Sequence, residues 1–280
     1  MLSRTIAIGL LLLPASLLAS PLFDVHLHYN RSAAAHYTPS QIVALLERNN
    51  IQQAVITSSP PSHSETLYRQ APQRIIPLLG IYRNDADKLN WPHDPDLVTR
   101  IEAQLKKGFW RGIGELHIFA RDRHSLVFKQ VVTLAAQHRL PLQIHGDPAV
   151  IDSVYDMAPG HPVVWAHAGT FPYPDLLADY LRRYPALRVD LSVRDERIAP
   201  NGKLSDDWYQ LFMRYPDRFM VGVDTFSLLR WNNFDKAVAS IRYWLAQLPD
   251  DIAQQLAYDN AAALFDRTGT RNKAGLLSEN

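Results

Sequence analysis

The sequence Phe-Asp-Val-His-Leu-His, residues 23–28, carries the signal from which the fold and the site can be worked out. On a β-strand, residues two apart point to the same side, so His26 and His28 should face inward together while Val25 and Leu27 face outward. Two imidazoles placed in this way can share one metal ion. Taken alone, the pair is equally consistent with two ordinary polar residues at the entrance of a loop.

Short apolar runs rich in β-branched residues recur along the chain and alternate with segments of helical period. This alternation is typical of βα units around a parallel sheet. A chain of 280 residues is close to the roughly 250 that eight such units need. We therefore predict an α/β fold, a single-domain (β/α)8 TIM barrel, with strands at residues 22–25, 53–57, 75–81, 112–116, 142–144, 163–166, 188–193 and 219–223.

Helices are predicted between these strands, several of them opened by Ser or Pro at an N-terminal position. One further helix should follow the last βα unit. The predicted helices span residues 39–48, 65–70, 95–107, 125–138, 148–157, 174–184, 205–215, 233–247 and 250–265.

The first twenty residues have the pattern of a signal peptide. Arg4 supplies a short positive region, residues 6–18 are almost wholly apolar, and Ala19 and Ser20 are small. The apolar run is shorter than the roughly 20 residues that a spanning helix needs. We expect a secreted or periplasmic protein with no stable membrane span after signal cleavage, or, in the alternative, an uncleaved N-terminal anchor.

The predicted organisation is therefore a signal peptide at residues 1–20, a single (β/α)8 barrel domain at 21–266 and a polar tail at 267–280. Without the leader, 28 basic residues balance 28 acidic ones. A protein that binds nucleic acid needs a basic surplus, so we expect no nucleic-acid partner and a small-molecule substrate instead. The chain contains no cysteine. Nothing in it indicates an oligomeric state.

Polar residues that can bind metal end four further predicted strands. Glu115 ends the fourth strand, His145 the fifth, His167 the sixth and Asp224 the eighth. In a (β/α)8 barrel the carboxyl ends of the strands build the active site, so these side chains should converge with His26 and His28. Any one of them alone would be an ordinary hydrogen-bonded residue of the barrel mouth, but their shared position favours a metal site.

Imidazole and carboxylate ligands suit a divalent metal, with zinc first and manganese, iron or nickel as alternatives. Asp224 should both bind the metal and relay a proton from the water that the metal activates. Glu115 either bridges two metals, binds one of them terminally, or orients a histidine without touching the metal. We therefore expect one or two ions.

Other candidates for the mouth are weaker. Arg194, after the seventh strand, could bind a substrate carboxylate, because a guanidinium matches that group with two parallel hydrogen bonds. His117, two residues after Glu115, should lie on the same face. The remaining histidines fall in loops or on helices, and we interpret them as structural or exposed: His36, His63, His93, His124, His138 and His161.

At these residues the chain resembles the amidohydrolase superfamily, and within it the amidohydrolase-related branch (amidohydrolase family 2) of metal-dependent TIM-barrel hydrolases. The resemblance rests on Phe-Asp-Val-His-Leu-His, on His-Ala-Gly with the following Val-Asp-Leu-Ser, on Asp-Arg-Phe-Met-Val-Gly-Val-Asp and on Asp-Asn-Ala-Ala-Ala-Leu-Phe. It covers about residues 23–265.

The resemblance implies that His26, His28, His145 and Asp224 hold a catalytic metal. It also implies that His167 binds a second metal or polarises the substrate. Many decarboxylases of this branch have no glutamate at the end of the fourth strand. Gly-Ile-Gly-Glu, ending at Glu115, instead looks like the metal-bridging glutamate of the TatD-type and phosphotriesterase-like branches.

These observations favour a metal-dependent hydrolase that uses metal-activated hydroxide to cleave an amide, ester or lactone bond of a small molecule, which could carry a carboxylate. One alternative is a metal-dependent carboxy-lyase on the same site, in which no water is added. Another is an exported barrel that binds a ligand without turnover.

Overall fold

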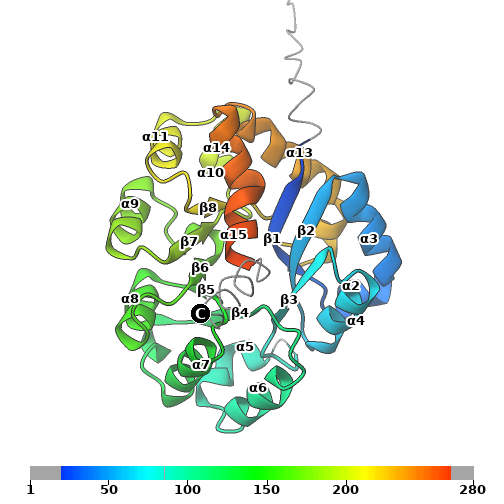
Figure 1. Ribbon diagram of the computed structural model, residues 1–280, viewed down its shortest axis with the longest axis vertical. Coiled ribbons are helices and arrows are strands. Elements are labelled where there is room, and N and C mark those ends of the chain that lie inside the picture. Colours follow the sequence, from blue (N-terminus) through cyan, green and yellow to red (C-terminus); the bar gives the residue numbers. More distant parts are fainter. Residues whose placement is uncertain (1–19, 85, 266–280) are drawn as a thin grey trace, which may run out of the picture.

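The computed structural model describes residues 20–84 and 86–265, so residues 1–19 of the predicted leader and the whole predicted tail lie outside them. Eight parallel strands in sequential order form a nearly closed barrel with helices around it (Figure 1). This confirms the predicted (β/α)8 TIM barrel. The strands are β1 (Leu22–His28), β2 (Ile51–Thr57), β3 (Ile75–Leu79), β4 (Gly112–Ile118), β5 (Leu142–Gly146), β6 (Val163–Trp165), β7 (Leu187–Asp190) and β8 (Phe219–Met220).

Long helices cover the outside of the barrel close to their predicted positions. They are α3 (Pro39–Arg48), α4 (Ser62–Gln70), α6 (Leu97–Leu105), α7 (Leu126–Gln137), α8 (Pro148–Met157), α9 (Pro174–Arg183), α11 (Asp206–Arg214) and α13 (Phe234–Leu245). Short helices that the sequence did not predict lie in the segments after the strands. They are α2 (Arg31–His36), α5 (Asp87–Asn90), α10 (Asp195–Ile198) and α12 (Leu228–Asn232).

The barrel closes between β8 and β1 by irregular hydrogen bonds, which explains why β8 is shorter than predicted. The N–H of Val25 donates to the carbonyl of Val221 at 3.0 Å, and the N–H of Asp224 donates to the carbonyl of His26 at 2.7 Å. Between them, Val223 N–H donates to the side chain of Asp24 at 3.1 Å rather than to a strand. These bonds place the residues after β8 directly against the histidine strand.

Strand β1 extends through His28, so the histidine pair lies within the strand and not after it. Its pairing with β2 shifts register between Asp24 and Leu27. Leu27 packs among the residues between strands and helices, as expected, but Val25 packs with Phe23 in the interior cluster. The expectation that Val25 faces the helices was wrong, because a bulge reverses the alternation at this point.

The amino-terminal end of the barrel is covered by the last helices, which cross in front of the strands in Figure 1. The predicted helix 250–265 is present as α14 (Asp250–Gln254), a π-helical turn η5 (Gln255–Asp259) and α15 (Asn260–Phe265). The ring of Phe23 lies 6.0 Å from that of Phe265 and 5.8 Å from that of Tyr258. An access route to the barrel interior therefore has to lie at the opposite end.

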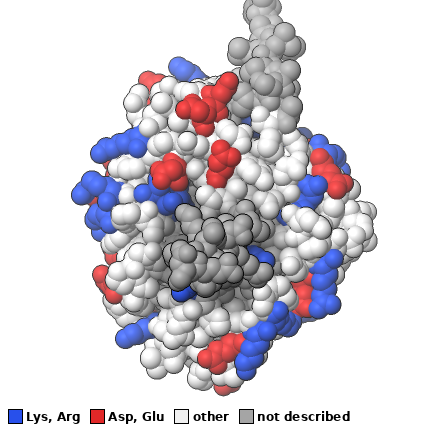
Figure 2. All heavy atoms as spheres, in the orientation of Figure 1, with Lys and Arg blue, Asp and Glu red and all other residues white. Residues whose placement is uncertain are grey.

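Charges of both signs are spread around the periphery of the face seen in Figure 2. Within residues 20–84 and 86–265, no helix has the length and apolar character needed to cross a membrane.

Candidate metal centre

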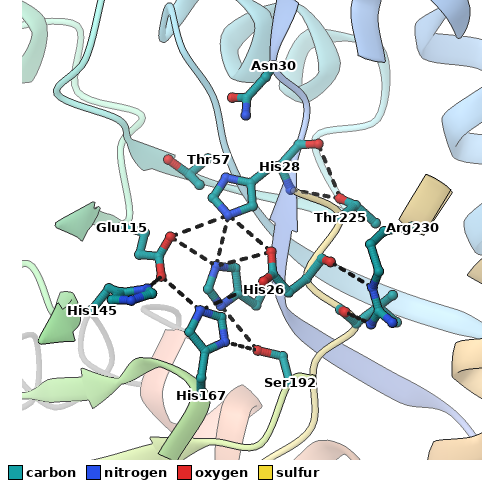
Figure 3. Close-up of polar contacts among 12 residues, drawn as sticks. His26, His28, Asn30, Thr57, Glu115, His145, His167, Ser192, Thr225 and Arg230 are labelled. Atoms are coloured by element: carbon teal, nitrogen blue, oxygen red, sulfur yellow. Dashed lines mark hydrogen bonds and ion pairs between the residues drawn. The ribbon is translucent and has the colours of Figure 1, made fainter. Parts of the chain in front are cut away.

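His26 and His28 bring their ring nitrogens together inside the barrel (Figure 3). The two Nε2 atoms are 3.1 Å apart, and both residues are buried. On the far side of the His26 ring, Nδ1 lies 2.7 Å from Oδ2 of Asp190. We assign the proton of a neutral His26 ring to Nδ1, because it then donates to this carboxylate. Nε2 keeps its lone pair directed toward His28, as a metal ligand requires.

The carboxylates of Glu115 and Asp224 lie next to the histidine pair, and we call these four residues the inner group. Oε2 of Glu115 lies 3.4 Å from Nε2 of His28 and 3.6 Å from Nε2 of His26. Oδ1 of Asp224 lies 3.2 Å and 3.9 Å from the same two nitrogens. This oxygen is buried, and its partners among the described residues are these two imidazole nitrogens. When both rings are neutral and direct their lone pairs inward, the ionised oxygen is costly to bury, and a bound cation would compensate its charge.

The spacing of these four atoms fits a divalent ion. Nitrogen and oxygen ligands lie about 2.0–2.2 Å from zinc, so two ligands at a tetrahedral angle are roughly 3.3–3.6 Å apart. The distances within the inner group run from 3.1 to 3.9 Å and include that range. The mixture of imidazole and carboxylate donors also suits manganese, iron and nickel.

An outer group faces the second oxygen of Glu115. Oε1 lies 2.9 Å from Nδ1 of His145 and 3.1 Å from Nε2 of His167. His117 stacks on His145 with 4.4 Å between ring centroids, and its Nε2 lies 3.5 Å from Oε2 of Glu115. Glu115 therefore stands between two groups of nitrogen ligands. The resemblance implies that His145 shares one metal with the β1 pair. In the structure His145 lies in the outer group instead, and its side chain is 44% exposed.

The close charges set the protonation states. Burial alone would raise the pKa of Asp224, but His26 and His28 outweigh it and lower this pKa to about 2. Burial also opposes ionisation of Glu115, yet His26 and His117 help hold its pKa well below the usual range. Burial would lower the pKa of His26, but Asp224 and Glu115 raise it well above its ordinary value. Without metal, the centre keeps its carboxylates ionised and a proton on His26.

A family model described as Amidohydrolase matches residues 24–267, which include both groups of candidate ligands. The chain belongs to the amidohydrolase family. It is thus an enzyme of the amidohydrolase type, a TIM barrel of metal-dependent hydrolase or lyase character. No curated protein shows significant sequence similarity to it.

Several solved structures share the barrel of this amidohydrolase. A probable 2-pyrone-4,6-dicarboxylic acid hydrolase from Acinetobacter baumannii, with citric acid bound, is 12% identical with a TM-score of 0.63 over 88% of this chain and 99% of that chain. An amidohydrolase from Burkholderia multivorans with bound zinc is 14% identical, with a TM-score of 0.57 and the same coverages of 88% and 99%. The 4-oxalomesaconate hydratase from Rhodopseudomonas palustris is 13% identical, with a TM-score of 0.58 over 92% and 100%. At these identities the likeness establishes the fold.

His167 follows β6 of this amidohydrolase in a left-handed backbone conformation, with a φ of 58°. Its Nδ1 lies 2.9 Å from Oγ of Ser192, which leaves Nε2 for Glu115. Arg194 donates from Nε to the carbonyl of His167 at 2.6 Å and from Nη2 to the carbonyl of Gly169 at 3.1 Å. Arg194 therefore positions His167, and its predicted contact with a substrate carboxylate stays a prediction.

Asp224 is held in a similar way after β8, with a φ of 55°. Arg230 donates from Nε to the carbonyl of Asp224 at 3.2 Å and from Nη2 to the carbonyl of Val223 (Figure 3). The hydroxyl of Thr225 accepts a hydrogen bond from the N–H of His28 at 2.9 Å. Two arginines thus fix the backbone at the two ligands that leave the regular strands.

The structure brings together all six residues that the sequence predicted for the metal site: His26, His28, Glu115, His145, His167 and Asp224. Sequence reasoning missed Asp190 and Ser192, which hold ring nitrogens of His26 and His167. Both lie within the predicted strand 188–193. Asp190 could have been found by an argument similar to that used for Asp224, because it is also a carboxylate within a predicted strand, next to apolar residues.

Apolar side chains surround the mouth of the barrel. All the large exposed hydrophobic residues among those described, except Met213, lie between the end of a strand and the first turn of the next long helix. Sites for small organic molecules commonly combine such apolar surface with a few polar groups. These residues are Leu89, Phe119, Leu126, Phe171, Tyr173, Phe226 and Leu229.

Proposed function

We propose that this amidohydrolase is a metal-dependent hydrolase that cleaves an amide, ester or lactone bond of a small organic molecule. The observation that carries the proposal is the position of Glu115, with one oxygen toward His26 and His28 and the other toward His145 and His167. Ionised Asp224 beside this arrangement supplies a proton acceptor.

The inner group of His26, His28, Asp224 and Oε2 of Glu115 would hold one divalent ion. Oε1 of Glu115, with His145 and His167, would hold a second. We propose zinc, with manganese, iron or nickel as alternatives, and the zinc bound in a structural neighbour supports this choice. When bound, such an ion polarises a carbonyl oxygen and lowers the pKa of water from 15.7 to about 7.

Asp224 is placed to take the proton of the attacking water. It is ionised at neutral pH, and its Oδ2 lies 3.7 Å from Nε2 of His167. Once protonated, Asp224 can return the proton to the departing alcohol or amine. If only the inner ion is bound, His167 presents Nε2 toward the same space and can instead polarise the substrate carbonyl. One water is consumed, and an acid and an alcohol or amine are formed, as two products from an ester or amide and as one hydroxy acid from a lactone.

Turnover in labelled water tests this proposal. The metal-loaded protein should act on at least one member of a panel of lactones, esters and amides, and the acid product should contain ¹⁸O from the solvent. Asp224→Asn should lower kcat by at least about 100-fold, because the amide cannot accept the proton. Metal content, measured on the same samples, should be largely retained.

Each other outcome selects a different function. Carbon dioxide release without ¹⁸O in the product would identify the carboxy-lyase alternative. Saturable ligand binding without product across the panel would identify a binding protein. Full activity of Asp224→Asn would contradict the proposed role of Asp224 as the proton acceptor.

We also propose that the protein is exported, as the pattern of residues 1–20 suggests. The carbonyl of Ser20 accepts a hydrogen bond from Arg242 at 2.7 Å, next to the start of β1 and at the end of the barrel opposite the metal centre. Cleavage nearby would leave the site intact. Fractionation with N-terminal sequencing should find a processed chain outside the cytoplasm, whereas an intact Met1 in the cytoplasmic fraction would contradict export.

A further inference from the structure

His117 lies in the barrel mouth, and the proposed function uses it for neither ion. It follows Glu115 by two residues on β4, and its Cα pairs in register with that of His145 on β5. Residues in register on neighbouring strands direct their side chains to the same side of the sheet. The two imidazole rings stack, with 4.4 Å between centroids and 23° between planes. His117 therefore covers one face of the His145 ring.

His145 is the most exposed of the three residues that would hold the outer ion, the second of the two proposed ions. Its side chain is 44% exposed, against 8% for His167 and 3% for Glu115. An exposed imidazole can leave its rotamer, and the ion then loses a ligand. Nδ1 of His145 lies 2.9 Å from Oε1 of Glu115, but this single contact leaves the ring free to turn about it. A ring stacked on its face opposes that turn.

The backbone of His117 is fixed on both sides. Its N–H donates to the hydroxyl of Tyr82 at 2.7 Å, and its carbonyl accepts the indole N–H of Trp91 at 2.7 Å. Both partners are buried. Nδ1 of His117 makes no hydrogen bond with the described residues. The strand and these two partners thus hold the His117 ring against its neighbour, as a rigid element holds a support for a metal ligand.

The orientation of the two rings separates a supporting role from a ligand role. Nε2 of His117 lies 3.5 Å from Oε2 of Glu115, which is close enough for a shared ion. An imidazole, however, binds a metal through a lone pair in the plane of its ring. An ion shared by His117 and His145 would have to lie in both planes, and two stacked rings do not meet this condition. Only one of them can bind the outer ion in this arrangement.

We propose that His117 is a positioning residue, whose ring holds His145 by stacking and thereby sets the affinity for the outer ion. The inference rests on the proposed function, because the outer ion is part of it. Groups that orient a metal-binding histidine without touching the metal change metal affinity by about 10- to 100-fold. The inner ion should respond less, because Asp190 and Arg230 support its ligands independently of His117.

Zinc titrations against a chromophoric chelator test this role. His145→Gln, which removes a ligand, identifies the binding step of the outer ion. His117→Ala should weaken that step by about 10-fold with little effect on the inner ion. His117→Gln, which also lacks a ring, should behave in the same way. His117→Phe should restore the affinity, because phenylalanine stacks but offers no nitrogen ligand. His138→Ala, at an exposed position that ends α7, is the matched control.

NMR spectroscopy of the metal-free protein gives a second measurement that does not depend on metal uptake. A stacked aromatic ring shifts the ring protons of its neighbour upfield. The ring protons of His145 should therefore move downfield in His117→Ala and His117→Gln, and should stay upfield in His117→Phe. Unmoved His145 signals in His117→Ala would show that the rings do not stack and would overturn the proposal.

The titrations separate this inference from the proposed function. Equal outer-ion affinity of wild type and His117→Ala would overturn the positioning role and leave the two-ion centre standing. Loss of an ion in His117→Phe, with the upfield shift retained, would identify His117 as a metal ligand and would also overturn it. Wild type that binds a single ion would refute the outer ion and the role of His117 with it. Protein that binds two ions, behaves as expected in every variant and hydrolyses nothing would refute only the proposed function.

Discussion

Asp190 shows how much one residue outside the predicted site contributes to it. Its Oδ2 lies 2.7 Å from Nδ1 of His26 and accepts the backbone N–H of His167 at 3.2 Å. One carboxylate thus orients a ligand of the inner group and the backbone of a ligand of the outer group. Partners of this kind fix the tautomer of a metal-binding histidine.

We predict that Asp190→Asn weakens zinc binding by about 10- to 100-fold, since an amide cannot hold the His26 ring as a carboxylate does. Competition with a chromophoric chelator measures the affinity. Asp152→Asn is the control, because that carboxylate binds Tyr180 and Arg183 on the outer surface. Zinc affinity unchanged in Asp190→Asn would refute this role.

The raised pKa of His26 predicts proton release when metal binds. At pH 7 the His26 ring of the metal-free protein is protonated on both nitrogens. Nε2 has to lose its proton before it can bind a metal. A group whose folded pKa is raised stabilises the metal-free protein at low pH, and that stability is lost as pH rises through the folded pKa. Zinc titrations in buffers of different ionisation enthalpy should show release of about one proton or more per ion. A heat independent of the buffer would count against this protonation state.

Single residues also show which contacts the sequence could not predict. Alternation of apolar and polar residues located His26 and His28, but it could not show that His26 meets Asp190, which is 164 residues away in sequence. Arg194 was correctly placed near the mouth. Its hydrogen bonds to two backbone carbonyls depend on the left-handed turn at His167, which no spacing rule contains.

At the scale of elements, strand β4 depends on one glycine for the position of Glu115. Gly114 has a φ of 151°, and a Cβ there would lie 2.7 Å from the backbone oxygen of Gln143 on β5. Only glycine allows β4 to approach β5 this closely. The residue that follows it is the carboxylate shared by both ligand groups.

Gly114→Ala should therefore displace Glu115 and lower both metal uptake and stability, the latter by about 1–3 kcal/mol. Thermal unfolding and metal analysis of the same samples measure the two effects. Gly108→Ala is a matched control, because Gly108 also has a positive φ, of 76°, but an added Cβ would meet nothing within 4 Å. Loss of stability in both variants with normal metal content would separate general strain from displacement of Glu115.

Strand positions were predictable because buried β-branched runs are distinctive, whereas strand ends were not. The pattern ended the first strand at residue 25 and the last at 223, whereas pairing with β2 extends β1 to His28 and irregular hydrogen bonds between β1 and the residues after β8 leave β8 ending at Met220. The bulge in β1 likewise depends on contacts with β2 and the residues after β8. The contact between Asp24 and Val223 joins residues 199 apart in sequence and leaves no local pattern.

At the scale of the whole molecule, the barrel brings six residues that are far apart in sequence together in one candidate metal centre. Parallel strands bring their carboxyl ends to one face, so the convergence of the ligands follows from the fold itself. The division into an inner and an outer group does not follow from the fold, because it depends on where the two oxygens of Glu115 point.

Because the ligands meet only in the folded chain, metal content is the most direct test of the account. Purified protein should hold about one or two ions per chain, or take them up from added zinc or manganese, and should melt at a higher temperature when loaded. Elemental analysis after dialysis against metal-free buffer provides the measurement. Less than about a tenth of an ion per chain, unchanged by added zinc or manganese, would contradict the metal centre and the function built on it.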